Sequence, residues 1–258
     1  MCALFKFAKS KPSVADAAQT PAPELKDAQL AAASYGQRMG GDLHDYIRVS
    51  PERVLFALLD VAGRREQNRA ILAVVQSTFR TCGPQLLAKD DTNEADAMIE
   101  ICIQLNRAIL TAARGVCSCT AFAGCYNENL GTVCYVNAGH TPGLLRDQTG
   151  VAELGATGLP LGLFSHSTPD ASIIALQPGA ALLLVSRGMV ETSRKAKEFG
   201  LPQVKDLLLL ATEQSAQEIC TTVLGRVNKF LAGKPAQNDI TAIALARSAV
   251  GKSFAAAG

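Results

Sequence analysis

The 258-residue sequence has no apolar stretch long enough to cross a lipid bilayer. Its first residues, Met-Cys-Ala-Leu-Phe-Lys-Phe, lack the long apolar segment and the small-residue cleavage site of a secretory signal peptide. The sequence also lacks an excess of charge of one sign, because its formal net charge is only +2. These absences predict a cytoplasmic protein that binds neither membranes nor nucleic acid.

Histidine is scarce, with three residues, and the eight cysteines do not form the paired Cys-x-x-Cys knuckles of structural zinc sites. Free cysteine packs as a small hydrophobic residue, so we expect buried thiols in a reducing compartment. Cys117 and Cys119 alternate along a predicted strand, whereas Cys125 and Cys134 flank a predicted hairpin turn at residues 127–131. A disulfide across that hairpin is the alternative.

The sequence is 48% hydrophobic, which is enough for one sizeable core in a chain of this length. We expect a mobile leader over residues 1–30, one domain over 31–248 and a tail over 249–258. Apolar residues at helical spacing predict helices over residues 64–80, 93–114, 199–210 and 215–231. Apolar runs between turn residues predict strands over residues 46–49, 53–61, 119–126, 133–137, 143–146, 151–154, 171–176, 181–185 and 240–246.

Acidic residues mark the ends of three predicted strands. The most apolar strand ends in Asp60, where an acid lies at the edge of the core. Asp42 follows two glycines upstream, and Asp239 opens the final strand. Acidic turns so far apart in the sequence indicate one site that the fold assembles. The alternative is that each acid is an ordinary polar strand cap.

Six short motifs follow one another along the chain. They read Gly-Gly-Asp-Leu-His-Asp at 40–45, Leu-Asp-Val-Ala-Gly at 59–63, Val-Asn-Ala-Gly-His at 136–140, Leu-Pro-Leu-Gly at 159–162, Leu-Val-Ser-Arg-Gly-Met-Val-Glu at 184–191 and Asn-Asp-Ile-Thr at 238–241. Their order resembles the SpoIIE/RsbU group of metal-dependent PPM protein serine/threonine phosphatases, over about residues 32–246. The resemblance implies an α/β (α+β) fold, a sandwich of two mostly antiparallel sheets flanked by helices.

The resemblance also implies a site for two manganese or magnesium ions that activate a water molecule, and aspartates suit such hard cations. Carried over by motif, Asp60 would bridge the ions, while Asp42 and the backbone carbonyl of Val61 would hold one of them. The other ion would need two acids from the last two motifs. At those positions this sequence has Arg187 and Asn238.

Asp239 survives in the last motif, but it matches a family position beside the main ligand, so it is a weak candidate. Without the missing acids, two dications about 4 Å apart repel each other strongly. We therefore expect one weakly bound manganese or magnesium ion or none, and two ions only if the site is active after all. Arg187 stays protonated at any pH, and we expect it to pair with Asp60 in about the place of the missing cation.

The loop after Asp60 also departs from the family pattern, because Arg65 replaces its second glycine. Arg64 and Arg65 at a helix N-terminus are candidates for binding a phosphate or a partner. The alternative is a solvated first helical turn in which Glu66 is their local partner. His140, in the Asn-Ala-Gly-His motif, is expected to shape a strand end rather than to act as a general acid.

Two classes of function fit these observations. The first is a pseudophosphatase or very weak phosphatase that binds a phosphoserine- or phosphothreonine-bearing signalling protein. The second is an active metal-dependent phosphatase. The resemblance implies a partner such as an anti-sigma-factor antagonist, and self-association as a homodimer is left open.

Overall fold

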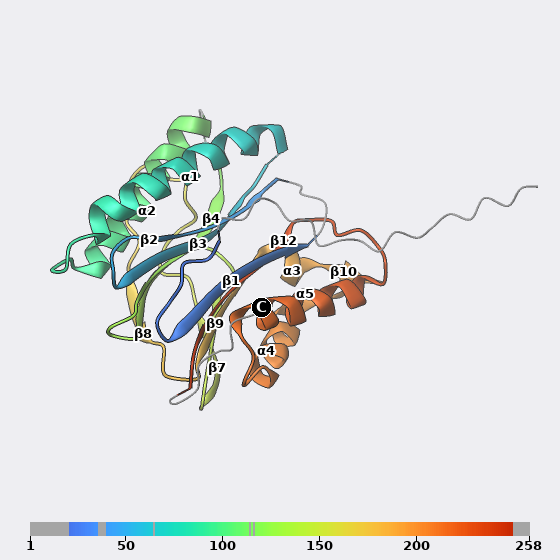
Figure 1. The fold of residues 1–258 in the computed structure, drawn as a ribbon. Helices are drawn as coiled ribbons and strands as arrows, with labels where there is room; N and C mark the ends of the chain where they lie inside the picture. The colour runs from blue at the N-terminus through green and yellow to red at the C-terminus, as the bar shows by residue number, and fades with distance from the viewer. Residues whose placement is uncertain (1–20, 36–39, 64, 114, 116, 250–258) are drawn as a thin grey trace, which may run out of the picture.

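A computed structural model of the protein describes residues 21–35, 40–63, 65–113, 115 and 117–249 (Figure 1). Two five-stranded antiparallel sheets face each other. The first has the order β1-β12-β9-β6-β7, with β1 (Ala28–Tyr35), β12 (Ile240–Arg247), β9 (Ala181–Val185), β6 (Gly143–Asp147) and β7 (Gly150–Leu154). The second has the order β2-β3-β4-β5-β8, with β2 (Asp42–Arg48), β3 (Arg53–Val61), β4 (Cys119–Asn127), β5 (Thr132–Ala138) and β8 (Ser172–Ala175).

Helices cover the outer face of each sheet, so the molecule has four layers (Figure 1). Helices α1 (Arg65–Leu87) and α2 (Glu94–Ala113) pack on the second sheet, where they bury one apolar cluster. Helices α4 (Gly200–Leu210) and α5 (Ala216–Leu231) pack on the first sheet and bury another. A short helix, α3 (Arg187–Glu191), follows β9, and β10 (Ser193–Arg194) and β11 (Lys197–Glu198) form a small ribbon. This arrangement confirms the predicted fold class.

Strand β3 shows why its sequence is apolar at nearly every position. Phe56 and Leu58 lie in the core between the two sheets, whereas Leu55 and Leu59 lie under α1 and α2. A strand that is buried on both faces has no position for a polar alternation. The apolar run is interrupted at the partly buried Asp60, and the strand ends at the buried Val61.

Most expected elements are present, although their limits differ. Strand β2 begins at Asp42 instead of residue 46, and α1 continues past Pro84 to Leu87 instead of ending at residue 80. Cys117 was expected on a strand, but it lies in the loop before β4. The hairpin of β4 and β5 was expected, and it aligns Cys125 with Cys134.

Strand β1 was not expected, and it begins at Ala28, inside the segment predicted as a leader. The sequence Ala-Gln-Leu-Ala-Ala-Ala-Ser-Tyr is rich in alanine, the residue with the strongest intrinsic preference for helix. Pairing with β12 along its whole length outweighs that preference. Residues 1–20, which make up most of the predicted leader, lie outside the described residues.

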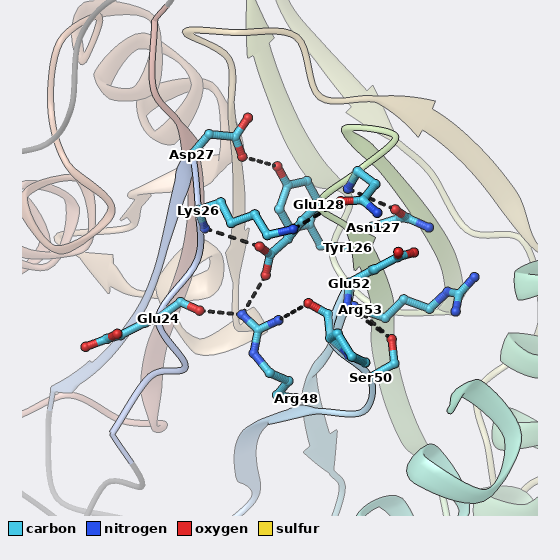
Figure 2. A network of polar contacts seen from close by, with 12 residues as sticks. Glu24, Lys26, Asp27, Arg48, Ser50, Glu52, Arg53, Tyr126, Asn127 and Glu128 are labelled. Atoms are coloured by element: carbon cyan, nitrogen blue, oxygen red, sulfur yellow. Dashed lines mark hydrogen bonds and ion pairs between the residues drawn. The ribbon is translucent and has the colours of Figure 1, made fainter. Parts of the chain in front are cut away.

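A polar network lies around Arg48 (Figure 2), which is at the other end of the β2–β3 pair from Asp60. The Arg48 guanidinium pairs with the buried carboxylate of Glu128 and donates to the carbonyl of Glu24. The Tyr126 hydroxyl donates to Asp27 at 3.2 Å. These contacts fasten the segment before β1 to the second sheet, so the two sheets are joined by hydrogen bonds as well as by the core.

The cysteines within the described residues are all free thiols. Cys125 and Cys134 face each other across the β4–β5 hairpin without a bond between them, so the disulfide alternative is not observed. Burial raises the pKa of Cys102 to about 12, which keeps that thiol protonated. In the part of the chain that the structure describes, no helix is both long and apolar enough to span a membrane.

Candidate functional site

Two of the expected acids lie side by side at one end of the second sheet. Asp42 begins β2 and is directly opposite Asp60, which is the last residue but one of β3. The side chain of Asp60 is 11% exposed. One carboxylate oxygen of Asp42, Oδ2, is buried and has no hydrogen-bond partner among the described atoms. The fold therefore assembles these two acids as the strand-end pattern predicts.

Burial gives Asp42 an unusual titration. Loss of solvent is the largest influence and raises the pKa of Asp42 to about 7. The Thr241 and Ser186 hydroxyls oppose this increase, whereas the negative charge of Asp60 adds to it. An acid in this state carries less negative charge near neutral pH than an exposed aspartate does.

Arg187 lies across the site from β3, as expected. Its Nε atom donates to Asp60 Oδ2 at 3.1 Å, so the predicted ion pair is present. The Arg187 side chain is 50% exposed, and Glu191 approaches the same Nε atom to 4.0 Å. One cation thus lies within reach of two carboxylates, and Asp60 already has a positive partner without any ion.

Hydrogen bonds join Ser186, the residue before Arg187, to the start of β12. The Ser186 N–H donates to the Thr241 carbonyl at 2.9 Å, and the Thr241 N–H donates to Ser186 Oγ at 3.0 Å. Gly188 lies against Asn238 and Asp239. A Cβ atom added to Gly188 would be only 2.1 Å from the Asp239 carbonyl oxygen. Asn238 itself is exposed. The two positions that lack acids are therefore neighbours.

Asp239 is turned toward the loop that precedes β2. Its Oδ2 atom accepts hydrogen bonds from the backbone N–H groups of Gly40 at 2.8 Å and Gly41 at 3.1 Å. A carboxylate held by backbone amides satisfies its charge locally. This geometry explains why Asp239 ties the start of β2 to the start of β12.

Asn68 is a site residue that the sequence reasoning missed. It lies in α1, is 1% exposed, and donates from Nδ2 to the backbone carbonyl of Val61 at 3.0 Å. That carbonyl is the one expected to face a metal ion. An asparagine on the buried face of the helix that follows the strand is the signal that could have found it.

Arg64 lies outside the described residues, and only the backbone of Arg65, the first residue of α1, is described. Their role in binding a phosphate or a partner stays a prediction.

His140 fits the structural role that its motif suggests. Its backbone N–H donates to Asn137 Oδ1 at 2.8 Å, while Asn137 Nδ2 donates to the Leu154 carbonyl at 3.2 Å. The ring is buried, its Nε2 atom has no partner among the described atoms, and burial lowers the pKa of His140 to about 4. The side chain is therefore neutral at physiological pH.

These contacts test whether the residues fit a pair of metal ions. Within the described ranges, no group of three or more His, Cys, Asp or Glu side chains is arranged to hold a metal ion. Asp60 is paired with Arg187, the Val61 carbonyl is bonded to Asn68, and Asp239 is bonded to backbone amides. The residues present do not fit a two-ion centre.

Comparison with protein families gives a match over most of the chain. The family model described as Stage II sporulation protein E (SpoIIE) matches residues 50–248. The protein IcfG of Synechocystis is 22% identical over an alignment of 246 residues that covers 88% of this chain and 39% of that protein. Phosphoserine phosphatase RsbP of Bacillus subtilis is 26% identical over 164 residues, 63% of this chain and 40% of that protein. The chain thus spans about two fifths of the length of these curated relatives.

Solved structures share the fold. The RsbU and RsbW domains of a Mycobacterium tuberculosis protein superpose with a TM-score of 0.71 at 21% identity, over 88% of this chain and 62% of that one. The catalytic domain of the serine/threonine phosphatase PstP, solved with two manganese ions, superposes with a TM-score of 0.62 at 13% identity, over 86% of this chain and 99% of that one. At these identities the likeness concerns the fold.

Proposed function

Because the chain belongs to the SpoIIE family of PPM-type phosphatases, we propose that it is a signalling protein of this fold with a crippled metal site. In this proposal it binds a phosphoserine- or phosphothreonine-bearing regulatory protein and hydrolyses it very slowly or not at all. The observation that carries the proposal is the ion pair between Arg187 and Asp60, the acid that would have to bridge two ions.

The charges around the site support this proposal. Asp42 and Asp60 lie side by side, Arg187 pairs with Asp60, and the carboxylate of the nearby Asp239 is bonded to backbone amides. A pair of dications needs several ligand charges, because the repulsion between two dications is about four times that between unit charges at the same distance. The guanidinium cannot lose its proton to admit them. Metal binding is therefore expected to involve at most one ion, held weakly by Asp42 and Asp60.

The nature of the partner is proposed from the relatives. One of them is a phosphoserine phosphatase, and another structure joins an RsbU domain to an RsbW domain. We infer a phosphorylated or phosphorylatable signalling protein of the bacterial cytoplasm, of the anti-sigma-factor antagonist type. In this proposal Arg187, which exposes half of its side chain, would contact such a partner.

The second candidate is an active metal-dependent serine/threonine phosphatase acting on the same class of partner. The adjacent carboxylates of Asp42 and Asp60 favour it, because they are the part of the ligand set that is retained. The Oδ2 atom of Asp42, which has no hydrogen-bond partner in the described part of the chain, is a further acceptor that a cation would satisfy.

Calorimetric titration of the purified protein with manganese and with magnesium separates the two candidates. The proposal predicts at most one weakly bound ion, together with no metal-dependent hydrolysis of an aryl phosphate above that of an Asp60→Ala variant. Two tightly bound ions with metal-dependent turnover that Asp60→Ala abolishes would establish the active phosphatase instead.

A further inference from the structure

The carbonyl of Val61 is held in a hydrogen-bonded position at the end of β3. The N–H of the same peptide group, which belongs to Ala62, donates to the Ser118 carbonyl at 2.8 Å and holds the peptide plane against the loop before β4. The Val61 oxygen accepts from Asn68 Nδ2 at 3.0 Å. The side chain of Asn68 therefore reaches back from α1 to the strand that precedes it.

The space around this hydrogen bond is filled by the two loops of the site. An added Cβ at Gly41 would lie 3.0 Å from the Val61 oxygen and 3.2 Å from Asp60 Oδ1. An added Cβ at Gly63, whose φ is +140°, would lie 2.8 Å from Asn68 Oδ1. The Asn68 side chain, on a residue that is 1% exposed, therefore lies close to the backbone of both loops.

The orientation of the Asn68 amide is fixed by the same contact. If the amide were reversed, its oxygen would face the Val61 oxygen, and two acceptors would oppose each other. In the orientation present, the N–H group satisfies the carbonyl, while Oδ1 is buried without a partner among the described atoms. A buried acceptor without a partner destabilises the folded state, so the hydrogen bond to Val61 must offset that cost.

We propose that Asn68 is a positioning residue that closes the Val61 carbonyl to metal ions. The amide N–H occupies one of the two lone pairs of the oxygen and carries partial positive charge toward it, so it competes with a cation for this acceptor and weakens the binding of that cation. This inference rests on the proposed function and deepens it. Arg187 occupies a carboxylate oxygen of Asp60, whereas Asn68 occupies the neighbouring main-chain oxygen of Val61. Two separate acceptors of the site therefore already have hydrogen-bond partners within the protein.

Because one of the two occupied acceptors is a neutral carbonyl, the obstacle to metal binding does not depend on charge alone. Replacing Arg187 changes the electrostatic balance at Asp60 but leaves the Val61 carbonyl bonded. Replacing Asn68 by alanine leaves every formal charge unchanged and frees one neutral oxygen. A change in metal affinity in the Asn68→Ala variant would therefore report on the main-chain acceptor rather than on the local charge.

The test compares the affinity for manganese of the full chain with that of the Asn68→Ala variant. Electron paramagnetic resonance measures the concentration of free ion in each titration. Gln67→Ala is the matched control, since it removes an exposed side-chain amide from the adjacent position of the same helix. Loss of one competing hydrogen bond is expected to raise the affinity of Asn68→Ala for manganese about tenfold, with no change in Gln67→Ala.

A second readout follows the carbonyl without using a catalytic assay. The backbone 15N signal of Ala62 reports on the Val61 peptide group, so magnesium should shift it in Asn68→Ala and leave it in place in the wild type. If alanine at this position prevents folding, Asn68→Ser provides a smaller change with the same readout.

Equal manganese affinity in folded Asn68→Ala and the wild type, with an unshifted Ala62 signal, would overturn the inference and leave the proposed function standing. Tight binding of two ions by the wild type would overturn the proposed function instead. The two failures are therefore distinguishable in the same titration.

Discussion

Arg187 Nε and Asp60 Oδ2 lie 3.1 Å apart although 127 positions separate the two residues in the sequence. The pair links the turn after β9 to the end of β3, and so it joins the two sheets at the site. It brings a permanent cation to the acid on which a metal centre of this fold would depend.

Removing this cation should change stability only a little. Arg187→Ala is expected to lower the free energy of unfolding by about 1 kcal/mol, because half of the arginine side chain is in water and exposed ion pairs contribute little. Urea unfolding measures the change. Arg226→Ala, at an exposed position of α5, is the control and should have almost no effect. A loss above about 3 kcal/mol would instead characterise the pair as a buried one.

Restoring the two acids should restore binding of a second ion. Arg187→Asp removes a cation and adds a ligand, whereas Asn238→Asp adds a charged ligand at nearly constant volume. Because both would serve the same ion, their effects should be strongly non-additive, with a larger gain in the double variant than the sum of the singles. The measurement is manganese stoichiometry across the wild type, both singles and the double.

Manganese-dependent hydrolysis of a phosphoserine peptide would then show whether the repaired centre is active. A double variant that binds two ions but lacks turnover would place the remaining defect elsewhere, most simply in the loop that carries Arg64 and Arg65. A double variant that binds no additional ion would contradict the assignment of these two positions.

Asp239 should stabilise the loop before β2 rather than bind an ion. Asp239→Ala removes the acceptor of the Gly40 and Gly41 N–H groups, and it is expected to cost on the order of 1–3 kcal/mol. Hydrogen exchange should become faster at those two amides. Asp206→Ala, at an exposed position of α4, is the control. Unchanged exchange at Gly40 and Gly41 would show that the carboxylate does not hold the loop.

His140 should make the protein sensitive to acid. Its pKa is about 4 in the folded state, against 6.5 as the ordinary value, so the unfolded chain binds more protons between these pH values. The free energy of unfolding should therefore fall as the pH is lowered from about 6.5 to 4, by roughly 2–3 kcal/mol in all. His140→Gln, which is neutral throughout, should flatten this slope.

The comparison must be made between variants, because Asp42 acts in the opposite direction. Its raised pKa means that the folded state binds more protons between pH 3.8 and about 7, which favours folding at low pH. That contribution is common to the wild type and His140→Gln, so their difference isolates the histidine. His166→Gln, at an exposed position, is the control. Parallel pH profiles for the wild type and His140→Gln would refute the prediction.

The sequence was most informative where a motif and a physical requirement coincide. Asp60 ends a strand that is buried on both faces, and the register places Asp42 beside it, so the two acids of the site were predictable. The ion pair with Arg187 was predictable as well, because a lost acid replaced by a cation leaves Asp60 in need of a partner.

Other features depend on contacts that no local pattern encodes. Strand β1 has the alanine content of a helix and becomes a strand only through its pairing with β12. Asn68 lies among helical positions, and only the packing of α1 on the end of β3 directs its amide to the Val61 carbonyl. The orientation of Asp239 toward Gly40 and Gly41 likewise follows from tertiary placement, not from its neighbours in sequence.

The partial exposure of Cys117 offers a way to observe the site without altering it. Among the cysteines that the structure describes, this is the one that is not fully buried, and its Sγ atom lies 3.8 Å from the Ala62 carbonyl oxygen. After Cys2→Ser substitution, a thiol-reactive fluorophore would attach at this position, because the remaining described thiols are enclosed in the core. Its emission would follow movements of the loop behind Asp60 as ions or partner proteins arrive.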